Sequence, residues 1–234
     1  MAFPDFHDDT FVAFCDISGF KSMMSGNSTK AIQSLGKFYE TVYSALQETR
    51  AANRVPIYGL VVTDCAVLVA ANEGNQSKTN ALEALLSVIA TINKKLLEFD
   101  LMITTSISHG EFHYEQRMEF FGIEKNMVTG AAYIEAFKNQ SAGSPKLKCG
   151  QCRIIPTGLP PEIAALLDNE ARTGVFRMVI KEKQHFYFYW MRDTPDEIAA
   201  FNEAYGNTEN LKFLGIRLLL NGNNVIQVRG GGRS

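Results

Sequence analysis

Uninterrupted runs of apolar residues that stop at an acidic residue are the clearest pattern along this chain. One run covers residues 11–15 and is followed directly by Asp16. A second strand pattern covers residues 60–70, and Asp64 interrupts it. A continuous apolar run is typical of a strand buried on both faces, whereas an ionised carboxylate is unstable in a dry core without a partner. The pattern therefore predicts that burial ends at Asp16 and that the chain turns near Asp64.

Two longer stretches, residues 29–50 and 78–99, have apolar residues at helical spacing. Asn27, Ser28 and Thr29 provide an N-cap for the first stretch. Both stretches are therefore predicted to be helices that each bury one face. The apolar positions are Ile32, Leu35, Phe38, Tyr39, Val42, Tyr43 and Leu46 in the first, and Leu82, Leu85, Leu86, Ile89, Ile92, Leu96 and Leu97 in the second.

Strand patterns lie between and after these helices. Residues 57–62 and 65–70 read as a hairpin, residues 101–108 as a further strand, and residues 179–190 as a strand pair. The order strand, helix, strand, strand, helix, strand is that of a ferredoxin-like fold. The sequence therefore predicts an α+β protein with a ferredoxin-like antiparallel sheet covered by helices.

Length and composition indicate one large domain followed by an extension. The chain has 234 residues, of which 46% are hydrophobic, so it can bury a sizeable core. We expect one domain over residues 8–192 and a C-terminal helical extension with a flexible tail over residues 193–234. The net charge of −2 does not suggest a nucleic-acid-binding surface. No segment resembles a signal peptide or a membrane span, so we expect a cytoplasmic protein without direct membrane association.

The four cysteines include one closely spaced pair. Cys149 and Cys152 form a CxxC pair, which fits half a zinc site, a redox pair, or two ordinary thiols. Cys15 and Cys65 lie in the apolar strands beside the two aspartates, and they cannot complete a zinc tetrahedron without leaving those strands. The pattern favours ordinary thiols and no disulfide framework.

The two aspartates are the candidate chemistry of the chain. A hairpin beside the first strand can bring Asp64 to Asp16, and Ser18-Gly19 forms a tight turn whose backbone amides can face an anion. Two carboxylates plus a backbone carbonyl can hold Mg²⁺ or Mn²⁺ with a triphosphate. The alternative is a plain strand-to-loop junction in which Asp16 caps the following segment.

Residues 14–20, Phe-Cys-Asp-Ile-Ser-Gly-Phe, resemble the F-x-D-I-x-G-F strand and turn of class III nucleotidyl cyclases. Thr63-Asp64 resembles that family's second metal aspartate, which usually follows Gly. The resemblance implies two Mn²⁺ or Mg²⁺ ions held by Asp16, Ile17 and Asp64. It also implies nucleotide contacts from the turn residues Ser18, Gly19 and Phe20.

A third motif, residues 128–135, resembles the V-N-x-A-x-R-x-E helix start of the same family, with two replacements. Thr129 takes the place of the asparagine that orients the ribose, and Tyr133 that of the arginine that stabilises phosphate charge. A tyrosine can donate a hydrogen bond but carries no positive charge. There are two alternatives. In the first, another cation replaces the charge of the arginine and Tyr133 is a catalytic hydrogen-bond donor. In the second, the protein is inactive and Tyr133 packs the helix. Lys181 and Lys183 resemble the family's triphosphate-binding K-x-K hairpin, although solvated hairpin lysines are common.

The base-reading positions also differ from those of purine cyclases. Leu60 stands where those enzymes carry lysine or glutamate, and Tyr58 is the nearest polar side chain. With Thr129 and Tyr133, these replacements make the chain most similar to the pyrimidine cyclases of Pycsar antiphage systems.

That resemblance implies conversion of UTP to cyclic UMP and pyrophosphate as a second messenger in antiphage defence. It further implies a head-to-tail homodimer with composite active sites and a separate effector protein that reads the product. The alternatives are a cytidylate or purine cyclase, or an inactive nucleotide-binding regulatory homodimer.

Overall fold

The structure is a computed structural model that describes residues 3–52, 55–71, 77–120 and 123–191, together with residues 196, 197 and 199. The extension and tail predicted over residues 193–234 lie almost wholly outside the described residues. Within the described part of the chain, no helix is long and apolar enough to cross a membrane.

An eight-stranded sheet forms the centre of the molecule, with the order β2-β3-β1-β4-β6-β8-β7 and with β5 paired to β4. All of these neighbours are antiparallel except β4 and β6, which run parallel. The predicted α+β fold with an antiparallel sheet is thus confirmed, with one parallel pair added. The strands are β1 (Phe6–Ile17), β2 (Ile57–Val62), β3 (Cys65–Ala70), β4 (Ile103–Phe120), β5 (Ile123–Thr129), β6 (Cys152–Ile154), β7 (Val179–Glu182) and β8 (His185–Phe188).

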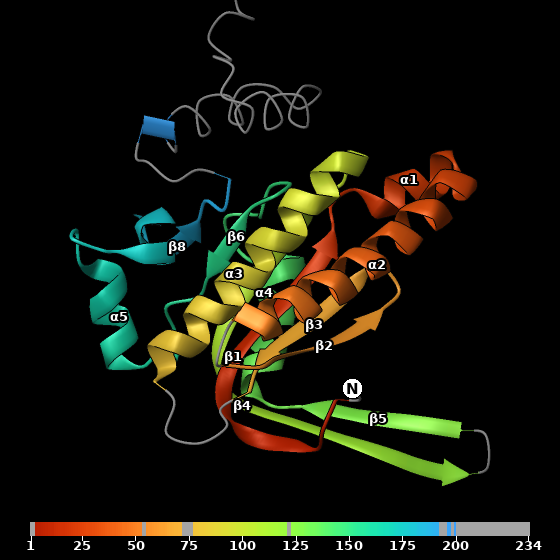
Figure 1. Ribbon diagram of the computed structural model, residues 1–234, viewed down its shortest axis with the longest axis horizontal. Coiled ribbons are helices and arrows are strands. Elements are labelled where there is room, and N and C mark those ends of the chain that lie inside the picture. The colour runs from red at the N-terminus through yellow and green to blue at the C-terminus, as the bar shows by residue number, and fades with distance from the viewer. Residues whose placement is uncertain are drawn as a thin grey trace, which may run out of the picture.

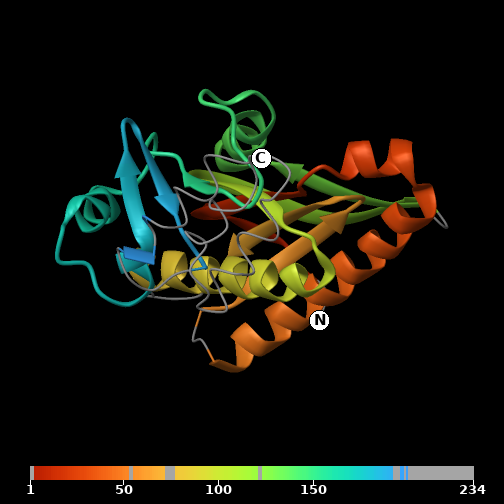
Figure 2. The same cartoon turned by 90° about the horizontal axis from the view of Figure 1, so that it is seen from above.

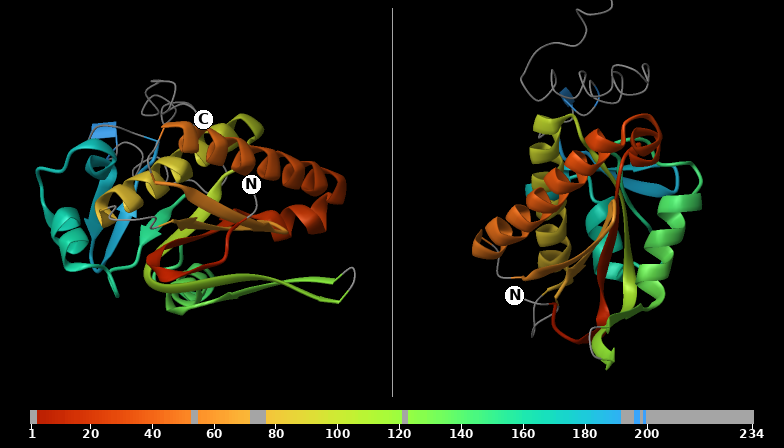
Figure 3. Two further views of the ribbon diagram at one scale, coloured as in Figure 1. Left: turned by 60° about the horizontal axis from the view of Figure 1, so that its bottom comes forward. Right: turned by 90° about the vertical axis from the view of Figure 1, so that its right-hand side faces the viewer.

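Helices cover both faces of this sheet. Figure 1 shows α2 and α3 lying side by side over one face, and Figures 2 and 3 show α4 on the opposite face. The side chain of Asn27 caps α2 as predicted, since its Oδ1 accepts the backbone N–H of Lys30 at 2.9 Å. The helices are α1 (Phe20–Gly26), α2 (Ser28–Ala52), α3 (Lys78–Leu96), η1 (Leu97–Phe99), α4 (Ala131–Ala142), α5 (Pro161–Asp168) and η2 (Gly174–Met178).

Strand β1 divides its side chains between two apolar clusters, as alternation along a strand requires. Phe11 and Ala13 join the larger cluster with the α2 and α3 side chains, while Val12 and Phe14 join a smaller one with Ala132 of α4. Both clusters are buried, which is why this strand reads as a continuous apolar run. The alternation places Asp16 on the α4 face of the sheet.

Strand β4 is longer than the predicted strand at residues 101–108. It continues to Phe120 because it pairs with β5, from His113 opposite Thr129 to Phe120 opposite Ile123. Figure 1 shows the far end of this β4–β5 hairpin extending beyond the rest of the sheet. The apolar pattern of residues 101–108 does not indicate this extension, because it depends on the pairing of β4 with β5.

Candidate active site

The structure brings Asp16 and Asp64 together at one end of the sheet. Asp16 is the penultimate residue of β1 and lies opposite Cys65 of β3, and Asp64 occupies the tight turn between β2 and β3. The backbone N–H of Ile17 donates to the carbonyl oxygen of Asp64 at 3.0 Å, which ties this turn to β1. Thr63 adopts a left-handed φ of 53°, which is uncommon for a β-branched residue and explains why a glycine suits this position.

Three potential metal ligands meet at this point. One ligand atom each from Asp16, Asp64 and Cys65 lies within 4.8 Å of the other two. The thiol of Cys65 donates to Oδ1 of Asp16 over 3.3 Å. Among the described residues, neither carboxylate forms an ion pair with a lysine, arginine or histidine.

The electrostatics of the site favour a bound cation. Burial raises the pKa of Asp16; the hydrogen bond from Cys65 lowers it, and the charge of Asp64 raises it again. Burial and the nearby Asp16 also raise the pKa of Cys65. Two adjacent carboxylates without a counter-charge are stabilised by a divalent ion. The donor set therefore fits the metal that the sequence predicts.

The turn after β1 is anchored to β4 through Ser18. Its backbone N–H donates to the carbonyl of Met102 at 2.9 Å, and its hydroxyl lies 2.6 Å from that of Thr104. The amide of Ser18 is thus engaged inside the fold, so the predicted phosphate contact rests on Gly19 and Phe20. Gly19 has a φ of 80° and precedes the first residue of α1, Phe20.

Helix α4 carries Tyr133 on the same face of the sheet as Asp16. The Tyr133 ring centroid is 6.4 Å from that of Phe14, two residues before Asp16, and 6.4 Å from that of Phe137. Thr129 is exposed at the end of β5, immediately before the helix. The tyrosine therefore packs in an aromatic group, as the helix-packing alternative expects.

A close backbone contact fixes the start of α4. Gly130 has a φ of 118°, and a Cβ added there would lie 2.3 Å from the carbonyl oxygen of Glu111 on β4. Only glycine fits this approach. The contact determines where α4 presents Tyr133 and Thr129.

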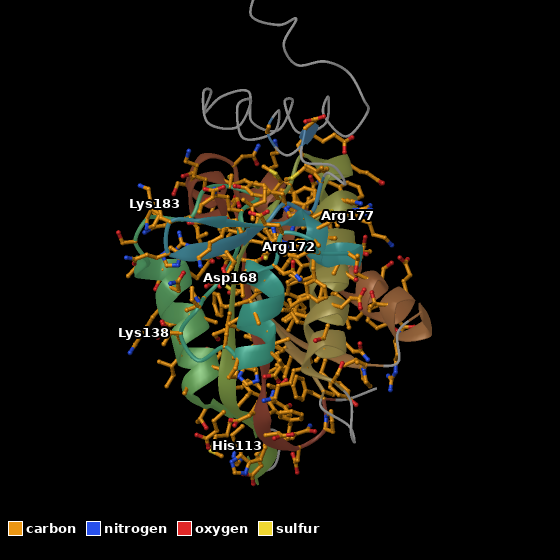
Figure 4. The ribbon with its side chains drawn as sticks, turned by 90° about the vertical axis from the view of Figure 1, so that its left-hand side faces the viewer. His113, Lys138, Asp168, Arg172, Arg177 and Lys183 are labelled. Carbon is orange, nitrogen blue, oxygen red and sulfur yellow. The ribbon has the colours of Figure 1, made fainter. Side chains whose placement is uncertain are left out.

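The two predicted lysines lie at the far edge of the sheet. Lys181 on β7 pairs with Asp168 of α5 at 2.7 Å, with both side chains half exposed, and Lys183 lies in the β7–β8 turn with a φ of 57°. Figure 4 shows Lys183 on the same side of the molecule as Lys138 of α4. Four strand-to-strand spacings separate β7 from β1 in the sheet, which corresponds to a distance of about 19 Å. A single chain therefore does not bring these lysines to Asp16.

Tyr58 and Leu60 lie on β2, opposite Val69 and Val67 of β3. Both side chains are half-buried and pack against the smaller apolar cluster, and the Tyr58 ring centroid is 5.2 Å from that of Phe3. They thus share the α4 face with Asp16, on the strand that leads to Asp64.

Sequence reasoning missed two features near the site. Cys65 belongs to the ligand group, which its position directly after Asp64 could have suggested. Arg153 of β6 is fully buried and donates to Oδ1 of Asn139 on α4 at 2.9 Å and to the hydroxyl of Tyr187 at 3.0 Å. No local pattern marks Arg153 as buried, because its partners come from α4 and β8.

Comparisons with known proteins identify the fold. The sequence matches no model of a protein family and no curated protein. The solved structure of the adenylyl cyclase CyaB from P. aeruginosa is similar, with a TM-score of 0.56 and 13% identity over 83% of this chain and 99% of that one. The monomeric guanylyl cyclase domain of the RhoGC fusion protein from the aquatic fungus Blastocladiella emersonii has a TM-score of 0.54 and 14% identity, over 80% of this chain and 98% of that one. The guanylyl cyclase Cya2 has a TM-score of 0.52 and 15% identity, over 80% of this chain and 93% of that one. The chain therefore has the fold seen in adenylyl and guanylyl cyclase catalytic domains.

Proposed function

We propose that this protein is a metal-dependent nucleotidyl cyclase. The observation that carries the proposal is the meeting of Asp16 and Asp64, without a counter-charge among the described residues, at the end of β1 on a cyclase fold. In the reaction, the ribose 3′-hydroxyl of a nucleoside triphosphate attacks the α-phosphorus, and pyrophosphate leaves. The chemistry supplied by two bound Mn²⁺ or Mg²⁺ ions is activation of that hydroxyl and neutralisation of the leaving group.

The side chains and backbone of the chain have separate roles in this proposal. Asp16, Asp64 and the carbonyl of Ile17 hold the ions, and the amides of Gly19 and Phe20 face the phosphates. Thr129 hydrogen-bonds the ribose, and Tyr133 donates one hydrogen bond to the phosphoryl oxygens. A tyrosine supplies no positive charge, so Lys181 and Lys183 provide the compensating cations.

The composite site requires two chains. Lys181 and Lys183 lie about 19 Å from β1 in their own chain, so they reach the metal-binding end only from a partner. The α4 face exposes apolar side chains that a partner can cover: Val62 is 64% exposed, Ile134 46% and Phe137 47%. We therefore include a head-to-tail homodimer with two composite sites in the proposal.

The proposed substrate is UTP and the product cyclic UMP. Leu60 offers no hydrogen bond to a purine edge, whereas the Tyr58 hydroxyl on the same face can donate to or accept from a pyrimidine. A mismatched hydrogen-bond pairing reduces the rate by orders of magnitude. Cyclic UMP would then act as a second messenger in antiphage defence and be read by a separate effector protein.

The packing of Tyr133 favours a second candidate, a catalytically inactive nucleotide-binding homodimer. The ring packs beside Phe14 and Phe137, and it replaces a cation with an uncharged group. Such a protein would bind nucleotide at Asp16 and Asp64 and release no pyrophosphate.

One experiment separates these functions. The purified protein is incubated with equal amounts of ATP, GTP, CTP and UTP and with Mn²⁺, and the products are separated by chromatography. We expect cyclic UMP and pyrophosphate, and no product from Asp64→Ala. Cyclic CMP as the main product would overturn the uracil assignment alone, whereas cyclic AMP or GMP would overturn the pyrimidine assignment as a whole. Nucleotide binding without pyrophosphate release would support the inactive homodimer.

A further inference from the structure

Cys65 adds a third side-chain donor to the candidate metal site. Its Sγ lies 3.3 Å from Oδ1 of Asp16, and it belongs to the group whose ligand atoms all fall within 4.8 Å of one another. Among the described residues, this is the one group of three or more cysteine, histidine or acidic side chains close enough to share an ion.

The sheet holds this thiol in place. Cys65 is the first residue of β3 and lies directly opposite Asp16 in the β1–β3 ladder. Side chains directly opposite in a ladder point to the same face, with Cβ atoms about 4.5–5.5 Å apart. The thiol therefore faces the carboxylate because of strand register, and it does not depend on a loop conformation.

We propose that Cys65 is a ligand of the ion held by Asp16 and Asp64, and that this site binds thiophilic ions such as Zn²⁺ and Cd²⁺ more tightly than Mg²⁺. The inference rests on the metal site of the proposed function and is independent of the substrate. Carboxylates and carbonyls alone suit Mg²⁺ and Mn²⁺, whereas a thiolate shifts the preference toward softer ions. On binding, the S–H bond of Cys65 breaks, a sulfur–metal bond forms, and the proton passes to solvent.

The consequence for the proposed enzyme is inhibition by thiophilic ions. Zn²⁺ bound through Cys65 would displace the ions that support turnover. Cys65→Ser replaces the thiol with a hydroxyl of similar size, which is a poor ligand for a soft ion. We therefore expect Zn²⁺ to inhibit the native protein at lower concentration than Cys65→Ser.

The other cysteines provide the controls. Cys15 and Cys152 are completely buried, so an added ion does not reach them in the folded protein. Cys149 is half-buried and lies outside the ligand group. Cys149→Ser is therefore the matched control for Cys65→Ser.

The test is a titration of the full-length, metal-free protein with Cd²⁺. Binding is monitored through the ultraviolet absorption band of thiolate-to-cadmium charge transfer. We expect a saturable band in the native protein and in Cys149→Ser, and none in Cys65→Ser or Cys65→Ala at the same concentrations. The Cd²⁺ affinity, measured by calorimetry, should fall at least about 10–100-fold, the loss already seen when an outer partner of a metal ligand is removed. The Mg²⁺ affinity should not change.

A band that persists in Cys65→Ser, is missing from the native protein, or disappears in Cys149→Ser overturns the inference. Circular dichroism of each variant shows that it is folded, and Cys65→Ala provides a second substitution if serine perturbs the strand. The two proposals fail separately. A Cd²⁺ band without cyclase activity refutes the enzyme alone, and activity without the band refutes the thiol ligand alone.

Discussion

At the residue scale, the surroundings of Asp16 destabilise its ionised carboxylate in the metal-free protein, whereas a bound ion stabilises it. Burial raises its pKa above the ordinary value of 3.8; the Cys65 hydrogen bond opposes this effect and the charge of Asp64 adds to it. A carboxyl whose pKa is raised by folding contributes stability below its unfolded pKa, and this contribution is lost as pH rises through the folded pKa. At neutral pH the ionised group therefore lowers the stability of the metal-free protein.

We expect Asp16→Asn to increase the free energy of unfolding at pH 7 in the presence of a chelator, and to remove cyclase activity completely. The amide keeps the shape of the carboxyl and cannot ionise. Urea denaturation at several pH values measures the stability, whose difference from the native protein should shrink as pH falls toward 4. Chromatography of the reaction products measures the activity. A variant less stable than the native protein at pH 7 would contradict this account of Asp16.

Arg153 is the other residue whose surroundings give a prediction. Its guanidinium is fully buried and bonds to uncharged groups: Oδ1 of Asn139, the carbonyl of Pro145 and the hydroxyl of Tyr187. It links α4, the following loop and β8. Because buried polar groups left unpaired are costly, this arginine stabilises the position of α4.

Arg153→Met should therefore reduce the free energy of unfolding by about 1–3 kcal/mol for each acceptor left without a donor. Tyr187→Phe should also destabilise the protein, because it leaves guanidinium N–H groups of Arg153 without their acceptor. In a double-mutant cycle measured by urea denaturation, the loss in the double variant should be smaller than the sum of the two single losses. Additive losses would show that the contact between Arg153 and Tyr187 does not contribute.

At the scale of single elements, the entry to α4 depends on the close approach of Gly130 to β4. We expect Gly130→Ala to destabilise the protein by at least about 1–3 kcal/mol, since the new Cβ meets the Glu111 carbonyl and φ is positive. Gly36, in the middle of α2, has no atom within 4 Å of an added Cβ. Gly36→Ala is the matched control and should stabilise by about 0.5–1 kcal/mol. Thermal unfolding of both variants tests the contrast, and equal effects would refute it.

At the scale of the whole molecule, the proposed homodimer makes each active site from two chains. Asp16→Asn and Tyr133→Ala should each be inactive alone. When they are mixed and allowed to exchange subunits, each heterodimer has one complete site, so activity should return to about a quarter of the native value for random exchange. Mass spectrometry of the mixture verifies exchange. No recovery after verified exchange would show that Tyr133 does not act across the interface.

Several parts of the fold and site follow from the sequence alone. The apolar run at residues 11–15 becomes the middle of β1 because both of its faces are buried. Asn27 caps α2 through a bond spanning only three residues. The turn that holds Asp64 could also be predicted, since two residues separate the strand patterns at 57–62 and 65–70. Each of these features depends on neighbouring residues or on the period of one element.

Other features depend on contacts between distant parts of the chain. Ser18 faces Thr104 because β1 pairs with β4, and Arg153 meets Tyr187 because β6 pairs with β8. The same is true of the parallel pairing of β6 with β4 and of the length of β4. The position of Cys65 depends both on the local sequence and on a contact between distant parts of the chain. The sequence placed it beside Asp64, but the β1–β3 register turned its thiol toward Asp16, because side chains directly opposite in a ladder share a face.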